Sequence, residues 1–297
     1  SKASKMDIDE FRRTAHDVVD WMSDYLRDIE SHPVRAQVVP GEVFDQLPHD
    51  PPSVGTSPAA ILDDFKRVIL PGMTHWQHPS FFAYFPANAS PPSVLAEMIT
   101  ATLGAQCMSW ETSPAAAELE ERMMEWLRSM IGLPAAFQGV IQDSASTATL
   151  CAILSARERA TQWRVNEHGL SREGDMVVYG SSECHSSIEK AVKISGLGRQ
   201  NFHKVSVDKN FGMDPKALLE AVKADKAAGR HPICVVAALG STSSSAIDPL
   251  QSIADVCNQH NLWLHVDAAW AGAALVDPDF RWMIDGIEAG DSFVFNP

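Results

Sequence analysis

Asp267 is the residue whose place in the sequence points most directly to chemistry. It ends an apolar run that begins at Leu262, and such a run is typical of a buried parallel strand. The strand would carry the carboxylate to the carboxyl edge of a sheet, where α/β proteins bind ligands. Because burial disfavours the charged form, the carboxylate needs a positive or hydrogen-bonding partner. A pyridinium nitrogen is one candidate, since the small Ala268 and Ala269 would let an aromatic ring lie close to the backbone. Local hydrogen bonds alone are the alternative.

Further polar side chains stand at points where we expect other strands to end. In a parallel sheet these ends share one edge, so residues far apart in the sequence converge on one crevice. The residues concerned are Asp143 to Ser146, His185, Ser241 with Thr242, and Asn296.

The segment from Asp143 to Ser146 opens a predicted helix and has two interpretations. The unpaired amides and the dipole of a helix N-terminus favour an anion such as phosphate, to which the hydroxyls of Ser144 and Ser146 would add donors. Either serine would equally serve as an ordinary N-cap. His185 would stack on a cofactor ring or transfer a proton. A nucleophilic pair of His185 with Cys184 is disfavoured, because no activating third group is evident.

Other classes of site lack their usual motifs. An aspartate after an apolar strand also fits a magnesium-binding Walker-B strand, but no G-x-x-x-x-G-K-[ST] loop accompanies it. Gly196 and Gly198 lack the third glycine of a dinucleotide-binding fingerprint and precede a strand instead of following one. There is no H-E-x-x-H or G-x-S-x-G motif, and His75 and His78 lie in a proline-rich loop without other metal ligands nearby.

The composition of the 297 residues is that of a globular protein with roughly two domains. Only 24 basic residues face 38 acidic ones, and the net charge of −14 disfavours a nucleic-acid partner. No apolar stretch reaches the ~18 residues of a membrane span, and the N-terminus lacks the pattern of a secretory signal. The five cysteines are odd in number and widely spaced, which disfavours a disulfide framework. We therefore expect a cytoplasmic location and no membrane partner.

The first third of the chain is predicted to be helical and extended. Apolar residues at helical spacing predict a long amphipathic helix over residues 7–30, and the prolines that follow predict an extended arm over residues 31–58. Residues 75–92 are rich in aromatics and prolines, which indicates an ordered loop that lines something. Shorter helices are predicted over residues 59–70, 93–103 and 113–131.

From Gly139 onward the pattern alternates between strands and helices. Such alternation predicts a largely parallel sheet covered on both faces. Strands are expected at residues 140–141, 176–179, around Val205, and at 233–239, 262–266 and 292–295; helices are expected at 144–166, 186–194, 214–228 and 249–260.

Seven segments, in this order and spacing, resemble the pyridoxal-phosphate-dependent group II decarboxylases, and most closely the aromatic L-amino-acid decarboxylases. They are MSDYL from Met22, LPGMTHWQHPSFFAYFPA from Leu70, SWETSPAAAELEERMMEWL from Ser109, GVIQDSAST from Gly139, CHSS from Cys184, LWLHVDAAWAG from Leu262 and DSFVFNP from Asp291. The resemblance implies an α/β fold of the fold-type I PLP-dependent transferases, with a mostly parallel seven-stranded sheet and helices on both faces. It also implies an N-terminal helical dimerisation arm over residues 1–85, a large cofactor-binding domain over residues 86–297, and a homodimer. The family's C-terminal small domain would lie outside this chain.

The resemblance also implies that pyridoxal 5′-phosphate is the cofactor and that three residues are catalytic. Asp267 would face the pyridine nitrogen, His185 would stack on the ring opposite Ala269, and Thr242 would lie near the phenolic oxygen and the substrate carboxylate. Breaking a Cα–carboxylate bond leaves a carbanion, for which a protonated pyridine ring is the electron sink. The phosphate would be held by Ala145, Ser146 and Asn296, and the aromatic substrate wall would comprise Trp76, Tyr84, Phe85 and Pro86.

Three features depart from the family pattern. After Pro297 the family continues with His-Lys, whose lysine forms the Schiff base with the cofactor, so we expect no turnover from the chain as it stands. Asp143 often corresponds to glycine in animal members and puts an acid near the expected phosphate. Ala87 replaces a threonine that contacts a ring hydroxyl in animal enzymes, which favours phenyl or indole rings over catechols.

The expected function is decarboxylation of an aromatic L-amino acid of the tryptophan, phenylalanine, tyrosine or DOPA type to its amine and CO2. An aromatic aldehyde synthase is the alternative within the resemblance; His185 favours the decarboxylase, because some synthases carry asparagine there. A non-catalytic dimerisation or binding module is the alternative from another class.

Overall fold

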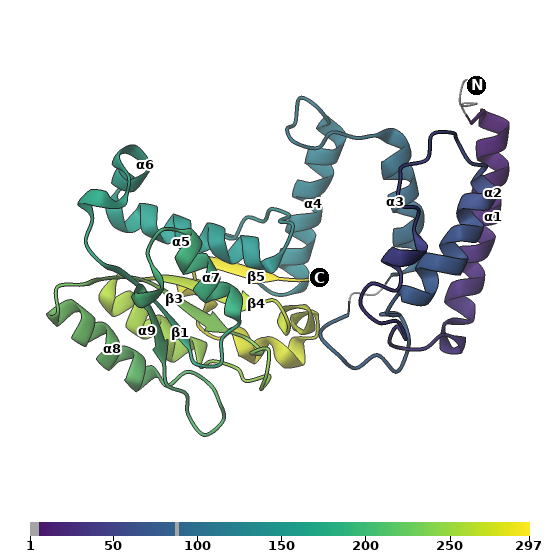
Figure 1. Cartoon of the computed structure of the whole chain (residues 1–297). Coiled ribbons are helices and arrows are strands. Elements are labelled where there is room, and N and C mark those ends of the chain that lie inside the picture. Colours follow the sequence, from purple (N-terminus) through teal and green to yellow (C-terminus); the bar gives the residue numbers. More distant parts are fainter. Residues whose placement is uncertain (1–5, 87–88) are drawn as a thin grey trace. The chain divides into compact units, whose positions relative to one another are not determined.

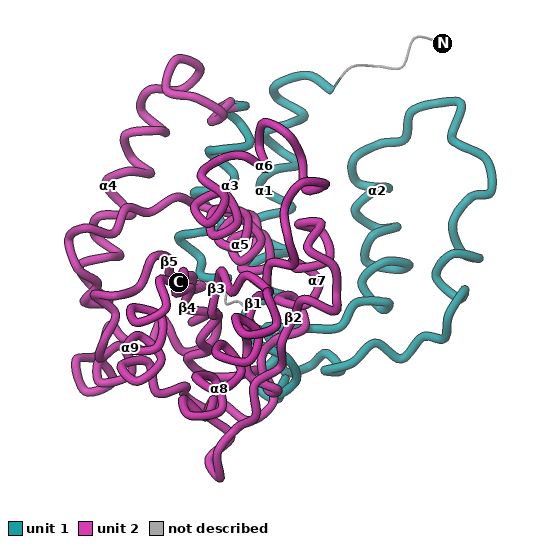
Figure 2. The backbone as a smooth tube through the Cα atoms, turned by 90° about the vertical axis from the view of Figure 1, so that its left-hand side faces the viewer, with its two compact units in different colours: residues 1–104 teal, residues 105–297 magenta. Residues whose placement is uncertain are grey.

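The computed structural model describes residues 6–86 and 89–297, so Ala87 lies outside the described residues. The chain divides into two compact units, Ser1–Gly104 and Ala105–Pro297 (Figure 2). This division falls after Gly104, and the functional boundary expected after residue 85 stays a prediction. None of the described helices is long and apolar enough to cross a membrane.

Unit 1 is helical, and its first helix begins where the sequence provides a cap. The carboxylate of Asp7 accepts the backbone N–H of Glu10 at 2.6 Å and so satisfies one of the free amides of the first turn. The short helix expected over residues 59–70 consists of an α-helix followed by a π-helical turn, Phe65–Ile69, and a 3₁₀ turn, Leu70–Gly72. The α-helices of unit 1 are α1 (Ile8–Arg27), α2 (Pro58–Asp64) and α3 (Pro91–Leu103).

Unit 2 is built on a parallel sheet (Figure 1). The strand order in this sheet is β2-β1-β3-β4-β5. The strands are β1 (Met176–Ser181), β2 (Phe202–Val205), β3 (His231–Ala238), β4 (Trp263–Ala268) and β5 (Ser292–Phe295). The α-helices are α4 (Pro114–Met130), α5 (Ala145–Thr161), α6 (Arg164–His168), α7 (Ser186–Ile194), α8 (Pro215–Ala227) and α9 (Leu250–His260). The prediction of a parallel α/β fold is confirmed.

The two faces of the sheet bury separate apolar clusters because successive side chains of a strand point to opposite faces. Val177 and Tyr179 of β1 belong to the cluster that includes Leu218 of α8 and Ile253 of α9. Val178 belongs to the other cluster, with residues of α5 and α7 such as Ile153 and Ile188. Helices therefore cover both faces, as expected.

Three details of the prediction are wrong. Val140 and Ile141 form no strand; they are 66% and 63% exposed, and the Ile141 amide donates to Oε1 of Glu120 at 2.9 Å instead of joining a ladder. The sheet has five strands in the described chain, not seven, and β5 is paired on one side only, with β4. The helix expected over residues 144–166 breaks between α5 and α6, because Gln162 and Trp163 adopt left-handed φ angles of 51° and 64°.

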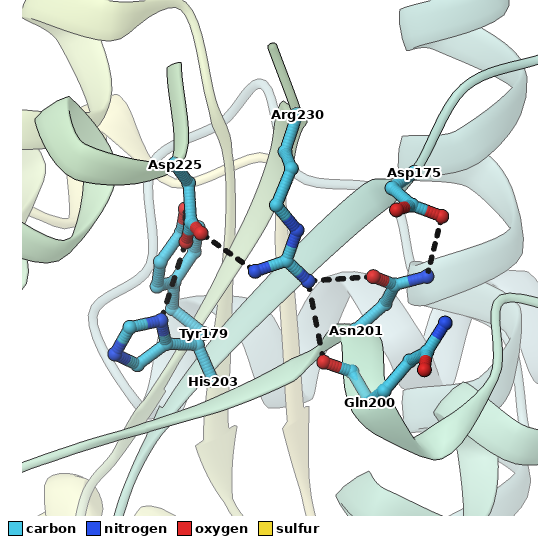
Figure 3. Close-up of polar contacts among 7 residues, drawn as sticks. All are labelled: Asp175, Tyr179, Gln200, Asn201, His203, Asp225 and Arg230. Atoms are coloured by element: carbon cyan, nitrogen blue, oxygen red, sulfur yellow. Dashed lines mark hydrogen bonds and ion pairs between the residues drawn. The ribbon is translucent and has the colours of Figure 1, made fainter. Parts of the chain in front are cut away.

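The amino ends of the strands are tied together by one buried polar network (Figure 3). Asp225 of α8 is its centre: its Oδ2 accepts the Tyr179 hydroxyl at 2.7 Å and lies 3.2 Å from Nδ1 of His203. Its Oδ1 accepts Nη1 of Arg230 at 2.6 Å, and Nη2 of Arg230 donates to Oδ1 of Asn201 at 2.6 Å. The network thus joins α8 to β1, to β2 and to the residue that precedes β3.

Charge pairing keeps this buried acid ionised. Burial alone would raise the pKa of Asp225, but the Tyr179 hydrogen bond and the Arg230 guanidinium outweigh it, so the pKa lies below its usual value. Conversely, burial and the Asp225 carboxylate raise the pKa of Tyr179, which stays a hydrogen-bond donor. At the amino edge of the sheet, the Asp225 carboxylate therefore has its hydrogen-bonding and charged partners within the protein.

We expect Asp225→Ala to lower the free energy of unfolding by about 3–5 kcal/mol, because it leaves Arg230 and Tyr179 without their buried partner. Urea unfolding at neutral pH would measure the loss. The control is Glu220→Ala on the same helix, whose exposed pair with Lys223 should contribute less than about 1 kcal/mol. Equal losses in the two variants would contradict this account of the network.

Candidate functional site

The carboxylate of Asp267 stands at the carboxyl edge of the sheet, as the sequence predicted. Trp263, His265 and Asp267 alternate along β4 and share the face on which Trp263 packs against the α5 and α7 cluster. Burial raises the pKa of Asp267, while a hydrogen bond from the Ala269 amide (3.2 Å to Oδ1) and the nearby His185 imidazole oppose the rise. Within residues 6–86 and 89–297, no lysine or arginine forms an ion pair with this carboxylate. The local hydrogen bond exists, but it leaves the acid in need of a positive partner.

His185 caps the neighbouring helix α7 and is held by it. Its Nδ1 accepts the backbone N–H of Ser187 at 3.2 Å and lies 2.8 Å from the Ser187 hydroxyl, which leaves Nε2 for another partner. The adjacent Cys184 is no nucleophile at neutral pH, because burial raises its pKa to about 12. The structure thus disfavours a Cys184–His185 pair, as the sequence did.

The start of α5 provides amide donors on the same face of the sheet. Ser144 is the N-cap, and its hydroxyl accepts the Thr147 amide at 3.2 Å, so the capping interpretation is correct for Ser144. Among the described residues the amides of Ala145 and Ser146 have no protein acceptor, as is usual in a first helical turn. These two amides and the dipole of a helix of 17 residues favour an anion.

A cavity of about 940 Å³ joins the start of α5 to the end of β5. Asp143, Ala145, His265 and Asn296 line it, together with residues of α4 and of the segment that follows α4. Asn296 also reaches β4, because its Nδ2 donates to the carbonyl of Ala269 at 3.1 Å. The exposed Asp143 therefore lies beside the predicted anion site, and what it does there stays a prediction.

Thr242 lies in the exposed loop that follows β3, and the base of this loop is fixed to β4. The Leu239 amide donates to the carbonyl of Asp267 at 2.9 Å, and Ala238 is paired in register with Asp267. The structure hence gathers seven of the predicted site residues at the carboxyl edge of unit 2. They are Ala145, Ser146, His185, Thr242, Asp267, Ala269 and Asn296; their roles toward a cofactor stay predictions.

The four residues predicted to form a substrate wall belong to unit 1. There the Trp76 ring stacks on Phe81 (centroids 4.8 Å apart) and on Tyr84 (5.6 Å apart). Trp76, Tyr84 and Phe85 are 44%, 79% and 50% exposed, and Pro86 is exposed as well. These rings form an accessible aromatic cluster within unit 1, and their contact with a substrate stays a prediction.

Sequence reasoning missed a buried polar chain beneath Asp267. The His265 ring lies 3.2 Å from the Thr149 hydroxyl through Nε2 and 2.8 Å from the Ser292 hydroxyl through Nδ1. Nε1 of Trp263 donates to the same Ser292 hydroxyl at 2.8 Å. The signal was present, because the spacing of two residues places His265 and Asp267 on one face of a strand. Burial lowers the pKa of His265 to about 4, so its imidazole is neutral at physiological pH.

Comparison with known proteins places these residues in a family. The conserved domain described as the pyridoxal-dependent decarboxylase domain matches residues 40–297. The chain belongs to the pyridoxal-dependent decarboxylase family. Family membership agrees with the resemblance drawn from the sequence motifs and with a pyridoxal cofactor.

Members of the decarboxylase family resemble the chain over nearly all of its length. Mouse aromatic-L-amino-acid decarboxylase is 43% identical over 304 aligned positions, which cover 98% of this chain and 63% of the mouse protein. Phenylacetaldehyde synthase of Petunia hybrida is 40% identical over 301 positions, covering 99% of this chain and 59% of the relative. A crystal structure of Oryza sativa TDC with PLP and tryptamine superposes with a TM-score of 0.94 at 35% identity, covering 99% of this chain and 62% of that one. The chain thus spans about three fifths of the length of these relatives.

We expect the neutral state of His265 to make stability pH-dependent. The folded pKa lies below the ordinary value of 6.5, so the unfolded chain binds more protons between pH 6.5 and 4. The resulting stabilisation is present above pH 6.5 and lost as the pH falls through about 4, by up to about 3 kcal/mol. His265→Gln should therefore unfold with a free energy that approaches the wild-type value as the pH falls from 7 to 4.5, as measured by denaturant titrations.

The matched control for this experiment is His49→Gln, because the His49 side chain is 98% exposed. This variant should follow the wild-type pH dependence. A constant difference between His265→Gln and wild type at every pH would contradict a buried neutral imidazole.

Proposed function

We propose that the protein containing this chain decarboxylates an aromatic L-amino acid with pyridoxal 5′-phosphate as cofactor. The observation that carries the proposal is the carboxylate of Asp267, which has no lysine or arginine partner among the described residues and shares the carboxyl edge of the sheet with the free amides of Ala145 and Ser146 in α5. A partly buried acid and a set of amide donors are complementary to a molecule with a cationic ring nitrogen at one end and a phosphate at the other.

Residues of this chain fit both ends of that molecule. Asp267 would pair with the pyridinium nitrogen and keep it protonated, because an opposite charge offsets the desolvation of the acid. Ala145, Ser146 and Asn296 would hold the phosphate, and His185 and Ala269 would enclose the ring from its two faces. Thr242 would stand near the phenolic oxygen. When bound, the cofactor accepts the electron pair that is left when the Cα–carboxylate bond breaks.

The fixed surroundings of these residues support their assigned tasks. The Ser187 contacts orient the His185 ring, and the bond from Asn296 to the Ala269 carbonyl joins the ends of β4 and β5. Because the neutral His265 adds no positive charge beside Asp267, the negative charge of Asp267 remains available to the pyridinium nitrogen. The acid then favours the protonated pyridine, on which decarboxylation depends.

An aromatic aldehyde synthase is the second candidate function. The 40% identity to a phenylacetaldehyde synthase supports this candidate. Such an enzyme would consume O2 and water and release CO2, ammonia, an aldehyde and hydrogen peroxide in place of CO2 and the amine. His185 supports the decarboxylase, following the expectation drawn from the sequence. Ala87 favours amino-acid substrates with a phenyl or indole ring over those with a catechol ring.

A homodimer is proposed as the working assembly. Helix α3 has no buried residue, and Leu95, Ile99 and Leu103 along it are 54%, 62% and 73% exposed. Apolar side chains at this spacing form a face that a second copy would cover. The cytoplasmic location likewise stays a prediction, supported by five free thiols.

Assays of the natural protein with added pyridoxal phosphate test the proposal. L-Tryptophan, L-phenylalanine, L-tyrosine and L-DOPA would be supplied in turn, with CO2, amine, aldehyde and peroxide measured as products. We expect CO2 and amine in equal amounts, with phenyl or indole substrates preferred to L-DOPA. Aldehyde with peroxide would favour the synthase, and no visible absorbance band with the cofactor would favour a non-catalytic module.

We expect Asp267→Asn to lower kcat by on the order of 100-fold or more, because it removes the charge that stabilises the protonated pyridine. Steady-state kinetics at saturating cofactor would measure the loss. The control is Asp255→Asn, an exposed acid of α9 whose carboxylate contacts Gln251. Unchanged kcat in Asp267→Asn would contradict the assigned role.

A further inference from the structure

Asp248 is a buried carboxylate at the carboxyl edge of the sheet that none of the assigned roles uses. It is 2% exposed, and each of its oxygens accepts one backbone amide. Oδ2 accepts the Ala238 N–H and Oδ1 accepts the Met213 N–H, both at 2.7 Å. The Asp248 amide in turn donates to the Ala238 carbonyl at 2.9 Å. The side chain thus joins the last residue of β3 to a separate segment of chain.

These contacts close the base of the loop that carries Thr242. Above the base, Leu239 and Ile247 form an antiparallel bridge, and the amides of Gly240 and Ser241 both donate to the Ala246 carbonyl, at 3.0 and 2.9 Å. The Ser241 hydroxyl lies 2.7 Å from that of Ser244. Thr242 is exposed and lies within this closed loop. The contacts at the two ends of the loop therefore determine where Thr242 lies.

The same base sets the position of Asp267. Ala238, whose amide Asp248 accepts, is the register partner of Asp267, and the next residue, Leu239, donates to the Asp267 carbonyl at 2.9 Å. The buried Asp248 therefore fixes the backbone at Ala238, from which both the Thr242 loop and the end of β4 at Asp267 are positioned.

We propose that Asp248 is a positioning residue of the cofactor site, which fixes the Thr242 loop and the end of β3 against Asp267 by accepting the Ala238 and Met213 amides. The proposal rests on the proposed function. Only a carboxylate of this size presents two acceptor oxygens here without a competing donor, since an asparagine amide would oppose one of the two N–H groups.

The electrostatic surroundings of Asp248 make its two hydrogen bonds, with the Ala238 and Met213 amides, sensitive to protonation. Burial raises the pKa of Asp248 to about 6, the two amides lower it, and the nearby Asp208 raises it further. The Cys184 thiol is a further titratable neighbour, and its pKa is raised by burial and by both Asp248 and Asp267. Protonation converts one acceptor oxygen into a hydroxyl and so weakens one of the two amide contacts.

The test compares wild type, Asp248→Asn and Asp225→Asn. The probe is pyridoxamine 5′-phosphate, which needs no covalent bond to the protein, and its Kd is followed through tryptophan fluorescence. Amide hydrogen exchange of the ligand-free proteins is measured in parallel. We expect Asp248→Asn to bind the probe at least tenfold more weakly and to exchange at least tenfold faster over residues 238–248, with no comparable change elsewhere.

Asp225→Asn is the matched control, because it removes another buried carboxylate from the opposite edge of the sheet. It should lower stability but leave the Kd and the exchange of residues 238–248 unchanged. Wild-type exchange and Kd in Asp248→Asn, or an equal loss of affinity in Asp225→Asn, would overturn the role of Asp248 and leave the proposed function standing. Failure of the wild-type protein to bind the probe would overturn the proposed function and the positioning role with it.

A measurement on the wild-type protein covers the case in which Asp248→Asn does not fold. The amide proton resonances of Ala238 and Met213 should shift together as the pH falls through about 6. Protection factors of residues 239–247 should increase over the same range, because opening the loop would expose Asp248 and return its pKa to the ordinary value of 3.8. Resonances and protection that stay constant across this range would overturn the proposal.

Discussion

The cost of placing a carboxylate at the end of a buried strand is the constraint on which the site depends. β4 delivers Asp267 to the carboxyl edge with one amide hydrogen bond from Ala269 and no lysine or arginine partner among the described residues. A charge in that position is unfavourable until something positive meets it. β4, a strand of the sheet, therefore also places a carboxylate that favours a cationic group on a ligand. The amides of α5 favour an anionic group at the other end of the same ligand.

The two edges of the same sheet contrast in this respect. At the amino edge, the Asp225 carboxylate meets Tyr179, His203 and Arg230, so its polar groups are satisfied within the protein. At the carboxyl edge of the described chain, Asp267 lacks a lysine or arginine partner, and the buried Ser181 hydroxyl and the first amides of α5 lack a hydrogen-bond partner. Asp248 is paired with two amides and His265 with two hydroxyls. Function is expected where partners are missing in front of a hydrogen-bonded support, and the carboxyl edge has that arrangement.

Sequence patterns predicted the elements that a single segment can specify. β5 and α7 begin and end where they were expected, and Asp267 falls at the end of its strand.

Features that depend on distant residues were not predictable. Val140 and Ile141 have strand-like side chains but no neighbouring strand to pair with in the described chain, and nothing in the local sequence marks Trp163 for a left-handed φ. Asp248 carries no motif, since its importance arises only when the folded chain brings Ala238 and Met213 to its two oxygens. The roles toward a cofactor came from the family resemblance, because spacing alone could not distinguish a phosphate site from an N-cap at Ser144.

The supporting groups behind the site also have opposite effects on the pH dependence of folding. The lowered pKa of His265 contributes stability that is lost as the pH falls from 6.5 to about 4. The raised pKa of Asp248 contributes stability that is fully present below its ordinary value of 3.8 and is lost as the pH rises through about 6. Each shift is of order 2 pKa units, or about 3 kcal/mol, so the two contributions largely cancel between pH 4 and 6. Asp225, whose pKa is lowered, loses its contribution only at still lower pH. Mild acid therefore protonates Asp248 at the site without a large change in the stability of the sheet that carries it.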